Sequence, residues 1–303
     1  NLLFSPNGNM VGFVRGGGAN QAGEIPNPSS DPAGAKEEVW TVDVRTGRLT
    51  RIGAGSVPIF SPAGDQVEYL REGHLWTVPA LGGKENRMFE LRGAVSGAPQ
   101  WSPDGSQLAF TSARGDHSFI AVFDKQANRF KFLSPSIDRD INPRWSPDGR
   151  HIAFIRLFNV TDTFSNDRDR FQPWAIEVAD VRTGEAKEIW HSGSADNDSY
   201  SGFGGDFWQW VAGNRILFSS EKDGWAHLYS ISADGGVVTA LTPGEFEVEN
   251  VDLSPDKSFV VFSTNKNDVD HRHLWRVNTS GGAPEQITKG DGIEMAPVFF
   301  DNG

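Results

Sequence analysis

A thirteen-residue pattern recurs along the chain and limits the possible folds more than any other feature. Residues 144–156 read RWSPDGRHIAFIR, and variants of this pattern occupy residues 59–71, 100–112 and 252–264. In Ser-Pro-Asp-Gly, proline holds φ near about −65°, aspartate accepts backbone hydrogen bonds, and glycine tolerates the positive φ of a tight turn. The apolar residues that follow, such as 152–154, do not alternate with polar ones, which is typical of a strand covered on both faces. Each copy therefore predicts a turn that leads into a buried strand.

A second motif follows each copy of the first one. It is a strand led by an aromatic residue or leucine, then a turn containing TG, GG or AN, then another strand, as in residues 39–52, 119–133 and 228–242. Two hairpins make four antiparallel strands, and the pair of motifs repeats about every 40 to 46 residues, the period of a propeller blade. We therefore predict an all-β propeller with six countable four-stranded blades. A two-sheet sandwich would explain the strands but not the fixed period.

The last residues leave the number of blades open. Residues 296–303, APVFFDNG, form a degenerate seventh copy of the first motif. This segment either completes the blade begun by residues 2–5 or starts a further one, in which case the six blades are part of a seven- or eight-bladed propeller.

Composition excludes several functions. The chain has no cysteine, which rules out disulfides, thiolate metal sites and a cysteine nucleophile, and leaves the redox compartment open. The net charge of −12 argues against binding to nucleic acid or to an anionic membrane surface. The apolar runs are far shorter than the roughly 20 residues of a membrane-spanning helix, so no membrane insertion is expected.

The motifs also resemble those of a known family. The pattern W-S-P-D-G-x-x-[I/L]-A-F is similar to the propeller repeats of the TolB type and to those of the prolyl oligopeptidase family of serine peptidases. The second family is the closer match, because SSEKDGWAHLYSISADGG at 219–236 and the stretch 270–294 resemble the N-terminal propeller of its dipeptidyl peptidase IV branch. The resemblance covers nearly the whole chain. It implies a propeller that filters peptides for an α/β-hydrolase domain, and it suggests a periplasmic or secreted bacterial protein, with a cytoplasmic one as the alternative.

The nucleophile of that family lies in a Gly-x-Ser-x-Gly elbow, and no serine of this chain has glycine at both required positions. We therefore expect residues 1–303 to form a single propeller domain without catalytic residues, and the native gene to continue past Gly303 into the hydrolase domain. The expected partners are that hydrolase domain and peptide substrates, with no cofactor; the oligomeric state is left open. The alternative is a stand-alone TolB-like scaffold for other proteins. A glycosidase or lyase working from its own channel ranks last, because no convergent carboxylates are visible on the inner strands.

One pair of adjacent acids and two long inserts are candidate peptide-binding elements. The resemblance implies a pair of adjacent glutamates, carried on a helical insertion, that grips the free ammonium of a peptide. Glu37 and Glu38 are adjacent, but their flanks lead directly into a strand and favour ordinary solvated acids. The insert 157–174 carries Arg168 and Arg170, and a salt-bridged surface loop is favoured over a contact with a peptide or hydrolase domain. In the insert 191–210, Trp210 is expected in the core; the residues considered for a channel mouth are Phe203, Phe207 and Trp208.

Histidines and aspartates that resemble metal or catalytic groups do not form a recognisable set. His271 and His273 would share one face of a strand, but no third ligand with suitable spacing follows. Asp138 and Asp140 lack a cation-binding loop pattern, and His117 has no identifiable catalytic partners. The GFGG at residues 202–205 lacks the strand-to-helix context of a phosphate loop. We expect no metal site.

Overall fold

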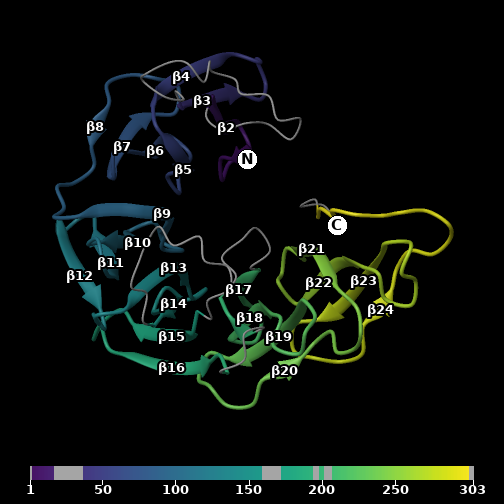
Figure 1. Ribbon diagram of the computed structural model, residues 1–303. Coiled ribbons are helices and arrows are strands. Elements are labelled where there is room, and N and C mark those ends of the chain that lie inside the picture. The colour runs from purple at the N-terminus through teal and green to yellow at the C-terminus, as the bar shows by residue number, and fades with distance from the viewer. Residues whose placement is uncertain (1, 17–36, 159–171, 194–197, 201–206, 300–303) are drawn as a thin grey trace, which may run out of the picture. The chain divides into compact units, whose positions relative to one another are not determined.

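The computed structural model describes residues 2–16, 37–158, 172–193, 198–200 and 207–299 (Figure 1). The chain divides into two compact units, Asn1–Pro135 and Ser136–Gly303. The described residues contain 24 strands, which form six antiparallel four-stranded meanders, three in each unit. We call these meanders blades 1 to 6. No helix in the described ranges has the length and hydropathy of a membrane span.

The first unit holds blades 1 to 3, in which each strand pairs with the next along the chain. Blade 1 contains β1 (Leu2–Phe4), β2 (Met10–Arg15), β3 (Glu38–Asp43) and β4 (Leu49–Ala54). Blade 2 contains β5 (Ser56–Phe60), β6 (Gln66–Arg71), β7 (His74–Pro79) and β8 (Asn86–Arg87). Blade 3 contains β9 (Ala94–Trp101), β10 (Gln107–Ala113), β11 (Ser118–Asp124) and β12 (Arg129–Leu133).

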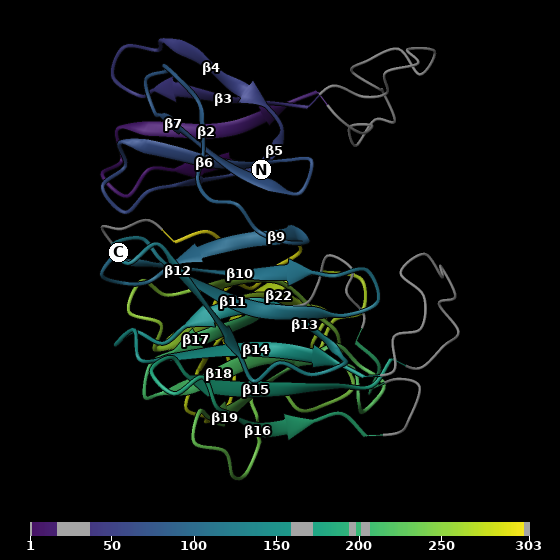
Figure 2. The same cartoon turned by 90° about the vertical axis from the view of Figure 1, so that its left-hand side faces the viewer.

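The second unit holds blades 4 to 6, and Figure 2 shows β14, β15 and β16 following one another in order. Blade 4 contains β13 (Arg139–Trp145), β14 (His151–Leu157), β15 (Trp174–Asp180) and β16 (Ala186–His191). Blade 5 contains β17 (Trp208–Val211), β18 (Arg215–Ser220), β19 (His227–Ser232) and β20 (Thr239–Ala240). Blade 6 contains β21 (Val248–Leu253), β22 (Phe259–Thr264), β23 (His273–Asn278) and β24 (Glu285–Gln286).

The Ser-Pro-Asp-Gly turns join the first and second strands of a blade through one recurring network. In blade 4 the Ser146 hydroxyl donates to Asp148 Oδ1 at 2.6 Å and accepts the N–H of His151 at 2.9 Å. The serine hydroxyl and a backbone N–H hold the pKa of Asp148 below its usual value. Gly149 has a φ of +67°, as the turn requires. The same bonds recur around Ser102 and Ser254, so the sequence motif encodes a specific hydrogen-bonded turn.

The second strand of blades 3 to 6, which carries the apolar run of the first motif, is covered on both faces as that run predicts. Phe110, Phe154, Phe218 and Phe262 occupy equivalent positions in β10, β14, β18 and β22 and are at most 1% exposed. One apolar cluster joins β14 and β15 of blade 4 to β17 to β19 of blade 5, and another joins blades 5 and 6. Within the second unit, successive blades therefore pack face to face.

The first strands are bulged at a common place. β5, β9, β13 and β21 each show a register shift, and each has a residue with positive φ there: Val57, Gly97, Asn142 and Asn250. Ala296, at the start of APVFFDNG, has a φ of +52°, equal to that of Val57, and each precedes a proline. The N–H of Phe299 donates to Asp252 Oδ2 on β21 at 2.8 Å. Residues 296–299 therefore lie beside blade 6, while blade 1 already has four strands of its own.

Candidate functional site

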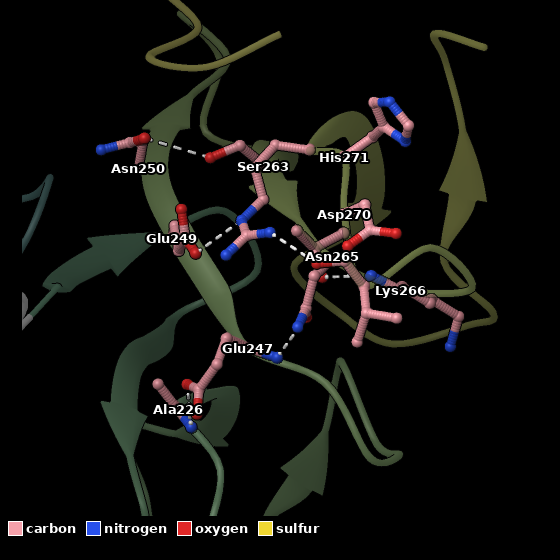
Figure 3. Close-up of polar contacts among 12 residues, drawn as sticks. Ala226, Glu247, Glu249, Asn250, Ser263, Asn265, Lys266, Asp270 and His271 are labelled. Carbon is pink, nitrogen blue, oxygen red and sulfur yellow. Dashed lines mark hydrogen bonds and ion pairs between the residues drawn. The ribbon is translucent and has the colours of Figure 1, made fainter. Parts of the chain in front are cut away.

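Acidic side chains gather in the second unit where β21 begins and β22 ends (Figure 3). We call Glu245, Glu247, Glu249, Asp268 and Asp270 the acidic rim. β21 and β22 are antiparallel, with Val248 opposite Thr264, so the loop before β21 and the loop after β22 meet at the same end of blade 6. The antiparallel pairing thus brings acids from two separate loops together.

Glu247 links the rim to blade 5. Its Oε2 accepts the N–H of Ala226 at 3.0 Å, and its own N–H donates to Asn265 Oδ1 at 2.8 Å (Figure 3). The N–H of Val248 also donates to the Ala226 carbonyl at 2.9 Å. Ala226 belongs to the EKDGWAHLY stretch, whose Asp223 accepts the Tyr229 hydroxyl at 3.1 Å. The most specific motif in the sequence therefore shapes the loop that contacts the rim.

The remaining acids differ in how far they are neutralised. Glu249 Oε1 pairs with Arg272 Nε at 2.9 Å. Asp268 pairs with His271 Nδ1 at 2.9 Å, and this bond, with two backbone N–H groups, keeps the pKa of Asp268 below its usual value. Glu245 and Asp270 are exposed, and their carboxylates have no hydrogen bond or ion pair with any described residue.

Cations near the rim do not balance its charge. The Lys266 amino group lies 4.1 Å from the Phe246 ring and 5.5 Å from the Trp275 ring, and burial lowers its pKa. Carboxylates in excess favour ligands that carry an ammonium or guanidinium group, because both form charge-assisted hydrogen bonds to carboxylate. In the described part of the chain, no group of three histidines or acids is arranged to hold a metal ion. The arrangement is suited to binding a cation-bearing ligand.

The structure places the adjacent acids at the start of β3. Glu37 is exposed, and its carbonyl accepts the N–H of Gly55 at 2.9 Å. Glu38 Oε1 accepts Arg51 Nε at 2.7 Å and its Oε2 accepts Trp40 Nε1 at 3.2 Å, so its pKa is lowered, first by the bond from Arg51. Both oxygens of the Glu38 carboxylate are thus bonded to residues of its own blade, Arg51 on β4 and Trp40 on β3.

The two long inserts are described in part. Arg168, Arg170, Phe203 and the GFGG at residues 202–205 lie outside the described residues. Trp210 is buried, as expected, but Trp208 is also buried, at 4% exposed, and lies in the core between blades 4 and 5 instead of at a channel mouth. Phe207 is half-buried against the core of blades 5 and 6.

The histidines and aspartates singled out in the sequence have local partners. His273 is buried and its Nδ1 lies 2.9 Å from Glu294 Oε2, while His117 Nδ1 lies 2.7 Å from Asp116 Oδ1. His271 is hydrogen-bonded to Asp268 of the rim, so His271 and His273 are bonded to different carboxylates. Asp138 accepts the Ser136 hydroxyl at 3.3 Å, and Asp140 pairs with Arg156.

Two buried acidic features, an ion triad that includes Asp140 and the isolated Glu68, have no counterpart in the sequence motifs. Asp140, Arg156 and Glu177 form an ion triad across β13, β14 and β15, with Arg156 Nε 2.7 Å from Asp140 Oδ1 and Arg156 Nη1 3.5 Å from Glu177 Oε1. Glu68 is buried on β6, and burial raises its pKa to about 7. Neither has a local sequence signal, because partners on neighbouring strands become apparent once the register is known.

Comparison with solved structures supports the fold. The structure of Porphyromonas gingivalis dipeptidyl peptidase 4 matches with a TM-score of 0.62 at 15% identity, over 96% of this chain and 46% of that one. A structure from Agrobacterium tumefaciens described as a TolB matches with a TM-score of 0.51 at 17% identity, over 81% of this chain and 86% of that one. The predicted all-β propeller of four-stranded blades is confirmed.

Sequence comparison adds a similarity to one type of propeller. Residues 166–303 match the family model described as the dipeptidyl peptidase IV (DPP IV) N-terminal region, which confirms the resemblance seen in the sequence. Dipeptidyl peptidase 4 of Trichophyton rubrum is 22% identical over 306 residues, covering 79% of this chain. An uncharacterised protein of Agrobacterium fabrum is 26% identical over 196 residues, covering 63% of this chain. The chain spans 38% of the length of the fungal peptidase and 57% of that of the bacterial protein.

Proposed function

We propose that this chain is the non-catalytic propeller of a serine peptidase of the dipeptidyl peptidase IV or prolyl oligopeptidase type. In this role it gates and positions peptide substrates for an α/β-hydrolase domain of the same polypeptide. The observation that carries the proposal is the match of residues 166–303 to the DPP IV N-terminal region. The resemblance also supports an exported location, in the periplasm or outside the cell.

The acidic rim gives this proposal a chemical basis in the described residues. A peptide presents a free ammonium group at its N-terminus, and the exposed carboxylates of Glu245 and Asp270 have no competing partner there. Glu247 is held in place by bonds to two loops, so the rim is ordered before a peptide arrives. The rim is the part of the chain that we assign to the peptide's amino end.

The decisive experiment measures hydrolysis of a panel of dipeptidyl-anilides by the whole natural polypeptide and by residues 1–303 alone. We expect the whole polypeptide to cleave members of the panel, and replacement of its elbow serine by alanine to abolish cleavage. We expect residues 1–303 to be inactive. A whole polypeptide with no hydrolase elbow, or cleavage by residues 1–303 alone, would refute the proposal.

One observation favours a second function, a TolB-like scaffold that binds other proteins. The chain covers 86% of the TolB structure from Agrobacterium tumefaciens, so a propeller of this type can account for most of a whole protein. This alternative expects a natural polypeptide that ends near residue 303 and has no hydrolytic activity in the anilide assay.

A further inference from the structure

Arg144, on the first strand of blade 4, has a guanidinium group without a counter-charge. Its Nη1 donates to the Pro143 carbonyl at 3.0 Å, while its Nε is buried and has no hydrogen-bond partner. No carboxylate among the described residues pairs with it, in contrast to Arg156 on the next strand, which has Asp140 and Glu177. Burial lowers the pKa of Arg144, which means that the protein around it disfavours its positive charge.

The groups beside Arg144 add further donors and a second cation. The Trp208 ring lies 5.9 Å from the guanidinium carbon, and the Trp208 indole N–H is itself buried without a partner. Lys257, in the turn between β21 and β22, has its pKa lowered first by burial and then by the charge of Arg144. The Lys257 amino group has no ion pair with any described residue, and its carbonyl accepts the N–H of Ala212 at 3.1 Å. The Ala212 bond fixes the Lys257 turn against blade 5.

A half-buried guanidinium whose Nε has no acceptor and a buried indole N–H without one are costly to a folded protein, whereas the exposed Lys257 side chain adds a positive charge beside them. Buried charges are normally paired, and a buried donor without an acceptor destabilises the fold. A purely structural arginine at this position would be expected to have a carboxylate beside it, as Arg156 does. An anion bound beside Arg144 would supply acceptors for its Nε and for the Trp208 indole N–H, and a counter-charge for both cations.

We propose that Arg144, Trp208 and Lys257 form a binding site for a carboxylate group. The Nε edge of a guanidinium presents two parallel N–H donors that match the two oxygens of a carboxylate, and Arg144 has its Nε edge unused. Lys257 adds a second positive charge and Trp208 a further donor. If the chain handles peptides, as proposed above, the carboxylate comes from a peptide C-terminus or from an acidic side chain.

Isothermal titration calorimetry of residues 1–303 with three short peptides tests the site without any hydrolysis. The probes are tri-alanine with a free C-terminal carboxylate, its C-terminal amide, and Ala-Glu-Ala blocked at both ends. We expect the free acid to bind at least about tenfold more tightly than the amide, since the amide lacks the charge that Arg144 recognises. Binding of the blocked Ala-Glu-Ala as tightly as the free acid assigns the site to side-chain carboxylates; weaker binding assigns it to C-termini.

Substitutions connect the binding to the proposed residues. We expect Arg144→Met to weaken binding of the free acid about tenfold, because it removes the two parallel N–H donors. We expect Lys257→Met to weaken it about threefold, because it removes only a more distant charge. Arg150→Met removes an exposed arginine beside Asp148 and is the matched control, with no expected change. If Arg144→Met does not fold, as judged by circular dichroism, Lys257→Met and Trp208→Phe test the same site.

Three results would overturn this inference: equal affinity for acid and amide, free-acid binding that is unchanged in the folded variants, or no binding of any probe at about 10 mM, the weak limit of specific recognition. The assay is independent of the hydrolase domain. Failure of the carboxylate site and failure of the peptidase proposal are therefore distinguishable.

Discussion

Glu68 keeps a carboxyl group inside the first unit with little to stabilise its ionised form. The side chain is 2% exposed, and its contacts with the Thr77 hydroxyl at 3.5 Å and the Trp101 indole N–H at 3.4 Å are long. Desolvation therefore dominates, and the pKa of Glu68 is raised from 4.5 to about 7. Between these two pH values the folded chain holds a proton on Glu68 that the unfolded chain has released.

This difference in proton binding predicts how stability depends on pH. The contribution of protonated Glu68 is complete below pH 4.5 and is lost as the pH rises through about 7, with a total of about 3 kcal/mol. Glu68→Gln keeps a neutral polar group at all pH values, so we expect it to match the native chain at pH 5 and to exceed it in stability at pH 8. Urea unfolding at several pH values measures this, with Glu90→Gln, an exposed acid, as control. A native stability that does not change over this range would contradict the interpretation.

At the scale of strands and blades, the local parts of the fold were predictable. The turns at Ser102 and Ser146 and the doubly buried strands β10 and β14 follow from short stretches in which each residue type has a known conformational preference. The ion triad was not predictable. Asp140 lies opposite Arg156 in a register that the bulge between Ile141 and Arg144 interrupts, and no local pattern specifies that alignment.

The ion triad offers a test of how blade 4 is held together. Asp140 is fully buried, and its two oxygens accept Arg156 Nε at 2.7 Å and Nη2 at 3.0 Å. We expect Asp140→Leu to lower the free energy of unfolding by about 3 to 5 kcal/mol, because it leaves the Arg156 charge without its main partner. We expect the double variant Asp140→Leu, Arg156→Met to be closer in stability to the native chain, because burial already raises the pKa of Glu177 towards its neutral form.

Chemical denaturation of the single and double variants gives the coupling energy between the two residues. The exposed pair of Arg276 and Glu285, joined at 2.8 Å across β23 and β24, is the matched control and should contribute under about 1 kcal/mol. Additive losses at Asp140 and Arg156 would show that the buried pair is not a coupled unit.

At the scale of the whole chain, the repeat period was enough to predict the blades, but the candidate sites required coordinates. The acids of the rim come from the loop before β21, from β21 itself and from the loop after β22, and in the sequence Glu245 and Asp270 look like ordinary solvated residues. Arg144 lies in a first strand whose sequence, NPRW, does not reveal that its guanidinium has no carboxylate partner among the described residues. Such features depend on which side chains meet, and sequence spacing does not encode those contacts.

The net charge of −12 predicts that cationic ligands are attracted before they make contact. The Debye length falls from about 30 Å at 10 mM salt to about 8 Å at 150 mM, so this attraction weakens as salt is added. We expect the association rate constant of tri-lysine amide, measured by stopped-flow tryptophan fluorescence, to fall by about tenfold over this range. An uncharged peptide should show little change.

A pair of variants separates the acidic rim from the charge of the chain as a whole. Glu245→Gln with Asp270→Asn removes two exposed rim charges, while Glu72→Gln with Glu185→Gln removes two exposed charges elsewhere and leaves the same net charge. Because the attraction between two charges grows as the distance between them shrinks, we expect the rim pair to slow association about threefold at low salt and the control pair to have less effect. Equal slowing by both pairs would mean that net charge alone attracts the peptide, and the rim would lose its assignment as the ammonium-binding element.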